Sequence, residues 1–146
     1  MAYTNALAAY KETRIRTASP GQLIVMLYDE AVKQLETGLE FLNKSKAGKI
    51  DPSKIEVFGK AMIKSRDIIT ELMVSLNLEE GGEIAQNLFA LYTWFNRELM
   101  EAHMNLDRER IETVKDQIDS LRGAWIEIAS KTNSEERQIE GVNIAG

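Results

Sequence analysis

The single histidine, His103, is the side chain best suited to acid–base, metal or phosphoryl chemistry. A di-iron centre in a helical bundle needs Glu-x-x-His pairs on facing helices. Here Met100, and not a glutamate, lies three residues before His103. The chain has no cysteine, which excludes disulfides, Cys-ligated metals and thiol catalysis. We therefore expect neither a metal nor another cofactor.

A lone histidine on a bundle helix could instead accept a phosphoryl group. Phosphotransfer bundles carry a motif similar to His-x-Leu-Lys-Gly, whereas this chain reads His103-Met104-Asn105-Leu106-Asp107. A partly exposed helix histidine without a special role is the simpler interpretation. No phosphate-binding loop, Ser/His/Asp set or isolated carboxylate pair stands out among the 23 acidic residues. The sequence thus predicts a protein that is not an enzyme.

The composition indicates one globular domain. The 146 residues are 44% hydrophobic and 28% charged, with a net charge of −5. An acidic surface argues against nucleic acid or an anionic membrane as the main partner. The longest apolar run, Leu23 to Tyr28, is too short to span a bilayer, and the N-terminus lacks the apolar region of a secretory signal. We expect a cytoplasmic protein without membrane insertion.

Helix signals divide the chain into four segments. Pro20 and Pro52 each follow a capping residue, Gly81-Gly82 interrupts the chain, and the residue type of Asp107 predicts an N-cap. Each segment between these signals has apolar residues at steps of three and four. The sequence predicts an all-α, antiparallel up-down-up-down four-helix bundle with short connections. The expected parts are an N-terminal arm at 1–16, a bundle at 17–132 with helices near 20–44, 52–78, 83–105 and 108–131, and a mobile tail at 133–146.

The core stripes do not use all of the large apolar residues. Ile55 and Ile128 fall on the stripes, whereas Phe41 and several residues of the second and third segments fall outside them. Broadened core stripes would explain some of this surplus, but together it predicts an exposed apolar groove able to accept another amphipathic helix. The residues predicted to form this groove are Met26, Val57, Ile63, Met73, Val74, Phe89, Trp94, Met100 and Met104.

The N-terminal arm has an apolar face of its own. Tyr3, Leu7 and Tyr10 are spaced as on one side of a short helix, and Ile15 follows. A frayed terminus would explain the pattern as well. The alternative is a reversible lid in which Tyr10 and Ile15 cover the apolar groove.

Several motifs together resemble one known family. They are Thr17-Ala18-Ser19-Pro20, Leu23-Ile24, Met26-Leu27-Tyr28-Asp29, Ala31, Gly82-Glu83-Ile84-Ala85, Asn87-Leu88, Leu91-Tyr92, Leu121-Arg122 and Ala124-Trp125, with Tyr10 upstream. In order and spacing they resemble the flagellar export chaperone family FliS over about residues 10–130. One departure is Glu30, where many members have glycine after the Tyr-Asp pair.

The resemblance implies a four-helix bundle that binds the disordered C-terminal region of flagellin in the bacterial cytosol. Such binding would prevent premature polymerisation and assist delivery to components of the flagellar type III export apparatus. It also implies that the N-terminal arm can occupy part of the client surface when it is empty. The alternative function is a structural helical module whose apolar face serves self-association, without flagellin binding.

Overall fold

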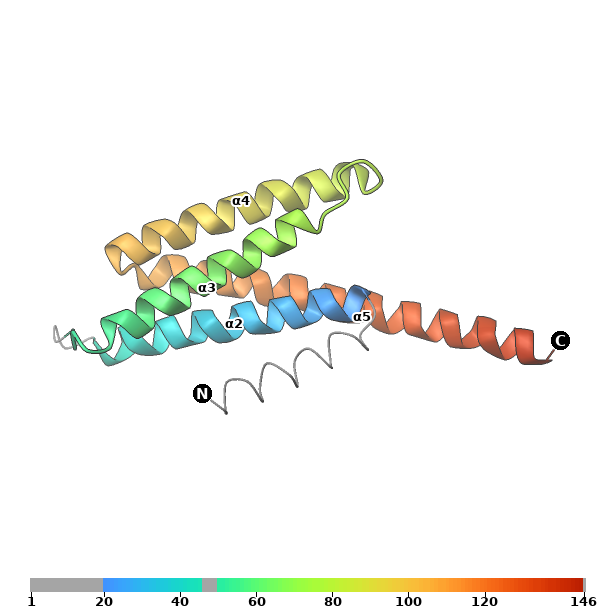
Figure 1. Cartoon of the computed structure of the whole chain (residues 1–146), viewed down its shortest axis with the longest axis horizontal. Coiled ribbons are helices and arrows are strands. Elements are labelled where there is room, and N and C mark those ends of the chain that lie inside the picture. Colours follow the sequence, from blue (N-terminus) through green and yellow to red (C-terminus); the bar gives the residue numbers. More distant parts are fainter. Residues whose placement is uncertain (1–19, 46–49, 146) are drawn as a thin grey trace, which may run out of the picture.

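The computed structural model describes residues 20–45 and 50–145, with side chains up to residue 131. Within this part the chain forms four helices: α2 (Pro20–Lys44), α3 (Ile55–Val74), α4 (Gly82–Asn105) and α5 (Arg108–Ala145), as Figure 1 shows. The expected arm at 1–16, with Tyr10 and Ile15, lies outside the described residues. No helix of the described part is long and apolar enough to cross a membrane.

The four helices alternate in direction along the chain (Figure 1). α2 packs against α3 and α5, and α4 packs against the same two helices, so that each helix has two neighbours in a closed ring. This arrangement confirms the predicted antiparallel up-down-up-down bundle. α2 and α4 are diagonal to each other, which determines which of the surplus apolar residues can share a surface.

The α3 helix is shorter than the predicted 52–78. The Asp51 carboxylate accepts hydrogen bonds from the Ser53 amide (3.0 Å) and hydroxyl (2.7 Å), which closes a separate turn before the helix begins. At the other end, the Asn77 side chain accepts a hydrogen bond from the Glu80 amide (3.0 Å) and holds the loop to α4. The capping residue before Pro52, Asp51, therefore stabilises a turn that precedes α3 and not the first turn of the helix.

The last helix is longer than predicted. We expected it to end near residue 131, and α5 instead continues to Ala145. Figure 1 shows this part of α5 projecting past the start of α2, where Gly21 and Ala129 lie close together. The segment after residue 132 has no proline and several good helix formers (Glu, Arg and Gln), which outweigh Gly141.

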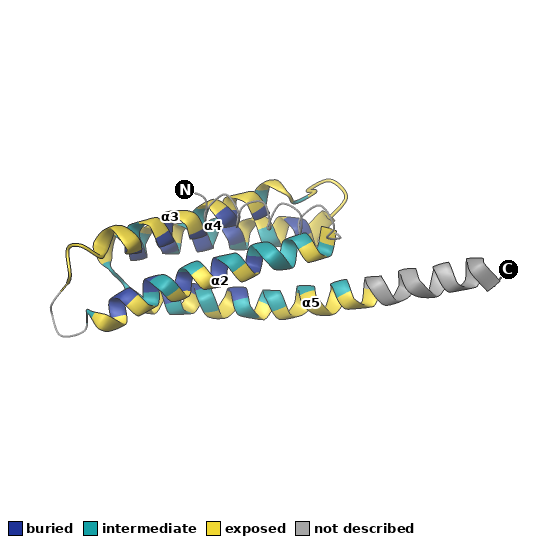
Figure 2. Ribbon diagram, turned by 60° about the horizontal axis from the view of Figure 1, so that its bottom comes forward, coloured by how far each residue is buried: buried dark blue, intermediate teal, exposed yellow. Residues whose placement is uncertain are grey.

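The core follows the predicted stripes with four exceptions among the large apolar residues, one of which is Ile68, placed outside its stripe but buried. Phe41, placed outside the stripe by its spacing, is buried with its ring 5.3 Å from that of Phe58. Ile55 and Ile128, placed on the stripes, are exposed. Ile55 is the first residue of α3, and the α5 segment around Ile128 lies where the bundle ends, which agrees with the exposure of both side chains. Figure 2 shows the buried positions on the faces that the helices turn toward one another.

A tight corner joins α4 to α5. Leu106 adopts the left-handed conformation (φ 53°), which is uncommon for a non-glycine residue, and its side chain packs against the core. The Asp107 amide then donates to the Ala102 carbonyl (3.0 Å), and the Asp107 carboxylate accepts from the Arg110 amide (3.3 Å). Asp107 therefore caps α5 as its residue type predicted.

Candidate functional site

The predicted groove residues divide into two groups by exposure. Met26, Met73 and Trp94 are half-buried, and the last two pack against the core. The other six are exposed large hydrophobic side chains, in the order Val57, Ile63, Val74, Phe89, Met100 and Met104. Val74 (81% exposed) and Met104 (72% exposed) have little contact with the bundle, so they do not serve its core.

A contact between Asn96 and Thr70 identifies the flanks on which α3 and α4 meet. Asn96 Nδ2 donates to Thr70 Oγ1 (3.2 Å) and lies 3.9 Å from Met73 Sδ. Residues three, four or seven apart lie on the same side of a helix. Met100 follows Asn96 by four residues, and Ile63 precedes Thr70 by seven.

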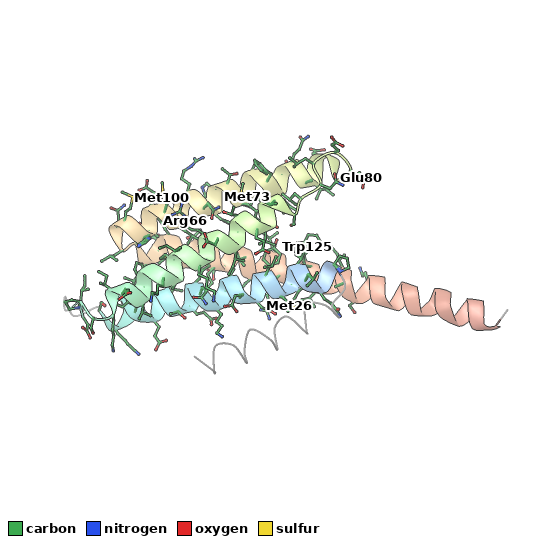
Figure 3. The ribbon with its side chains drawn as sticks, in the orientation of Figure 1. Met26, Arg66, Met73, Glu80, Met100 and Trp125 are labelled. Carbon is green, nitrogen blue, oxygen red and sulfur yellow. The ribbon has the colours of Figure 1, made fainter. Side chains whose placement is uncertain are left out.

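The same spacing brings further apolar residues to this side of the bundle. Val74 follows Thr70 by four residues, Phe89 precedes Asn96 by seven, and Met104 follows Met100 by four. Figure 3 shows Met73 and Met100 along the α3–α4 pair. We call this surface the α3/α4 face, and its apolar residues are Ile63, Met73, Val74, Phe89, Met100 and Met104.

Trp94 does not belong to the α3/α4 face. It precedes Glu98 by four residues, and Glu98 forms an ion pair with Arg110 of α5. Trp94 therefore lies on the flank of α4 that faces α5, and its ring is 5.8 Å from that of Phe95.

Val57 and Met26 also lie apart from the α3/α4 face. Val57 precedes Lys64 by seven residues, and the Lys64 ammonium is 3.5 Å from the Glu30 carboxylate of α2, so Val57 is on the α2 side of α3. Met26 is on α2, which is diagonal to α4, and Figure 3 shows Met26 on the far side of the bundle from Met100. The structure thus brings six of the nine predicted groove residues together.

Apolar character alone could not reveal the polar part of the α3/α4 face. Arg66 precedes Thr70 by four residues on α3, and its Nε is buried without a hydrogen-bond acceptor. Asn96 Oδ1 is buried without a donor, although the amide nitrogen of the same side chain is engaged. Most buried polar atoms in proteins have a partner, which makes this pair unusual. Arg66 and Thr70 follow Ile63 by three and seven residues, and this spacing was the sequence signal that could have placed them on the same side of α3.

A buried polar cluster holds the helices behind this surface. The hydroxyls of Tyr28 (α2) and Tyr92 (α4) share a hydrogen bond, and Trp125 Nε1 of α5 donates to the Tyr28 oxygen (3.2 Å). Burial raises the pKa of both phenols above the ordinary value of 10.0. These bonds connect the two diagonal helices to each other and to α5.

His103 packs as an aromatic side chain. It is half-buried, its ring meets that of Phe58 edge-on at 5.8 Å, and a methyl group on Gly59 would lie 3.5 Å from its Nε2. Among the described residues, no three His, Asp or Glu side chains are grouped so that they could hold a metal ion. The geometry around His103 is that of helix packing between α3 and α4.

The fold and this surface define a class: an all-helical bundle that keeps its core closed and exposes an apolar face along one helix pair, as binding proteins do. Comparison with known proteins gives the family. The profile of the family described as "Flagellar protein FliS" matches residues 3–132. The chain belongs to the FliS family.

Individual relatives agree with this assignment. The flagellar secretion chaperone FliS of Salmonella typhimurium is 34% identical over 126 residues, which cover 86% of this chain and 87% of the relative. The FliS proteins of Vibrio cholerae and Bacillus subtilis, with the same description, are 32% and 29% identical over 127 and 125 residues. They cover 84% and 86% of this chain, and 88% and 86% of their own lengths.

A solved structure shares the fold. It is described as a crystal structure of a flagellar chaperone from bacteria, and it matches with a TM-score of 0.66 at 18% sequence identity. The match covers 88% of this chain and 98% of that chain. The function that the family carries is that of a chaperone in flagellar secretion.

Proposed function

We propose that this protein is a cytosolic chaperone for flagellin, and that the α3/α4 face binds the disordered C-terminal region of flagellin. The observation that carries the proposal is the exposure of Val74, Met100 and Met104 on one side of a bundle whose core is complete without them. Family membership supports a client from the flagellar export pathway.

The chemistry of the face suits a segment that becomes ordered on binding. Methionine side chains are flexible and polarisable, so Met73, Met100 and Met104 can adapt to an incoming apolar helix face. Each apolar side chain that becomes fully buried contributes about 1.5–3 kcal/mol before ordering costs. Ordering the client costs roughly 2–5 kcal/mol, so a surface of several such side chains is needed for stable binding.

On this proposal the bound client cannot polymerise in the cytosol, and the complex delivers it to the export apparatus. The test is a calorimetric titration of the full chain with the C-terminal segment of flagellin from the same organism. We expect a one-to-one complex with an exothermic signal as the peptide becomes ordered. No binding would contradict the flagellin proposal. If sedimentation then showed a concentration-dependent dimer of the isolated protein, self-association would explain the exposed face.

We also propose that the N-terminal arm acts as a lid, with Tyr10 and Ile15 covering part of the apolar surface when no client is bound. The apolar spacing of the arm and the exposed face support this proposal. A chain lacking residues 1–16 should then bind the flagellin segment more tightly than the full chain does. Equal affinities would remove the lid and leave the chaperone proposal intact.

A further inference from the structure

Arg66 is partly buried, as Arg108 and Arg122 are, whereas Arg110 is exposed. Arg108, Arg110 and Arg122 each have a carboxylate within 4.0 Å. The Arg66 guanidinium has no carboxylate partner among the described residues, and its Nε is also shielded from solvent. The Nε atoms of Arg108 and Arg122 are also buried, but the Arg122 Nε lies 2.5 Å from an Asp29 carboxylate oxygen, and Glu112 pairs with a terminal nitrogen of Arg108.

Arg66 lies on the surface that we propose as the client-binding site, so a client could supply the carboxylate that it lacks. It lies on the α3/α4 face, one helical turn from Thr70, whose hydroxyl also donates to the Arg66 carbonyl (2.9 Å). Figure 3 shows Arg66 beside α4, in the neighbourhood of Met100. Arg66 thus shares the α3/α4 face with the exposed side chains of Ile63 and Met100, and no carboxylate of the described residues neutralises its charge.

The second unsatisfied atom on the same face is an acceptor. Asn96 uses its amide nitrogen on Thr70 and Met73, which leaves its buried Oδ1 without a donor. Through Thr70, this acceptor lies within about one helical turn of Arg66. Both atoms are shielded, but Arg66 and Asn96 as whole residues are only partly buried, so other atoms of these side chains remain open to a segment that binds here.

We propose that Arg66 binds a carboxylate side chain of the client through its terminal guanidinium nitrogens, so that the α3/α4 face selects an acidic segment with an apolar side. This inference rests on the proposed flagellin-binding function and adds the chemistry by which the client is recognised. A guanidinium and a carboxylate form strong charge-assisted hydrogen bonds, and apolar surroundings reduce competition from water.

The test uses the full chain and calorimetric titration with the flagellin C-terminal segment. Arg66→Met removes the charge while keeping the length of the side chain, and Arg66→Lys keeps the charge. Arg97→Met is the matched control, because Arg97 is exposed on α4 and this substitution changes the net charge by the same amount as Arg66→Met. Helicity and thermal unfolding of each variant are measured alongside.

We expect Arg66→Met to weaken binding at least about tenfold, the range for a lost hydrogen bond to a charged group. Arg97→Met should change the affinity less than about twofold, as is typical of a peripheral charge. The peptide is then varied by converting each Asp or Glu singly to its amide. One such change should weaken binding to the unmodified chain and have no further effect on Arg66→Met.

Three results would overturn the inference. Unchanged affinity of Arg66→Met would show that the guanidinium makes no contact with the client. Equal losses for every peptide variant in both proteins would show that no particular carboxylate pairs with Arg66. Absence of binding by the unmodified chain would overturn both the flagellin proposal and this inference, whereas the first two results leave the flagellin proposal standing.

Discussion

The hydroxyl groups of Tyr28 and Tyr92, which are 64 residues apart in the chain, share a hydrogen bond at the centre of the bundle. This bond joins α2 to α4, two helices that are otherwise diagonal, and Trp125 adds a third helix through the Tyr28 oxygen. Both phenols are almost completely buried. Each phenol must therefore remain protonated in the folded protein. The fold consequently loses stability when the solution becomes alkaline.

We predict that the free energy of unfolding falls as the pH rises above 10.0, the ordinary pKa of tyrosine. Burial raises the pKa of both phenols in the folded state, so the unfolded chain loses these protons first. The contribution is fully present below pH 10 and is lost at up to about 1.4 kcal/mol per pH unit for each phenol above it. Urea unfolding of the unmodified chain and of Tyr28→Phe/Tyr92→Phe between pH 9 and 11 measures the difference. Equal slopes would contradict the prediction.

We predict that Met100→Gln and Met104→Gln together weaken binding of the flagellin segment by about 1.5–3 kcal/mol, roughly ten- to a hundredfold. Both side chains are exposed, so thermal unfolding of the free protein should change little. Ile126→Gln is the control, since Ile126 is an exposed apolar residue on α5. A loss of affinity as large in the control as in the methionine pair would show that the α3/α4 face has no special role.

Substitution of Trp94 should lower the stability of the fold and leave client binding nearly unchanged, the opposite of the result expected for Met100 and Met104. Because it packs against Phe95 on the α5 side of α4, Trp94→Gln is expected to lower the free energy of unfolding by about 1–3 kcal/mol. Its effect on client binding should be small once the folded fraction is taken into account. Chemical unfolding combined with titration separates the two effects, and a stable variant with strongly reduced affinity would return Trp94 to the client surface.

Two glycines offer a test of how closely the helices approach. A Cβ atom on Gly38 of α2 would lie 2.6 Å from Met62 Cε and 3.6 Å from the Phe58 ring. Met62 is completely buried, so Gly38→Ala should destabilise the bundle by about 1–3 kcal/mol despite the better helix propensity of alanine. Gly123→Ala on α5 meets open space and should stabilise it by up to about 1 kcal/mol. Thermal unfolding of both variants gives the comparison. A stabilised Gly38→Ala variant would mean that α2 and α3 can adjust their packing to accept the added methyl group.

The helices and their order could be predicted from the sequence because each depends on local patterns. Apolar steps of three and four, Pro20 at a helix start and Asp107 at a cap act over a few residues, and the structure confirms the four helices, the start at Pro20 and the cap at Asp107. The helix ends were less predictable. Asp51 closes a turn before α3, and α5 continues to Ala145, since a polar segment of good helix formers needs no core to remain helical.

The sequence by itself also determined that the second and third helices carry more large apolar residues than a core needs. Which of these residues form one surface was a matter for the tertiary structure. Trp94 and Met100 are six residues apart on one helix, but they lie on flanks that face α5 and α3 respectively. The rotation of α4 about its own axis decides which flank each residue occupies. This rotation depends on packing against α3 and α5 at the same time.

The Tyr28–Tyr92 hydrogen bond and the environment of Arg66 could not be predicted either, because both depend on how different helices pack together. The Tyr28–Tyr92 bond joins residues on diagonal helices, and the lack of a carboxylate beside Arg66 within the described part of the chain depends on how the other helices are placed. Periodicity determines the face of a helix on which a residue lies, because a helix repeats locally. Partners across the bundle, or their absence, arise only when four helices settle into a common packing, since the contacts of each helix then limit the rotation of the others.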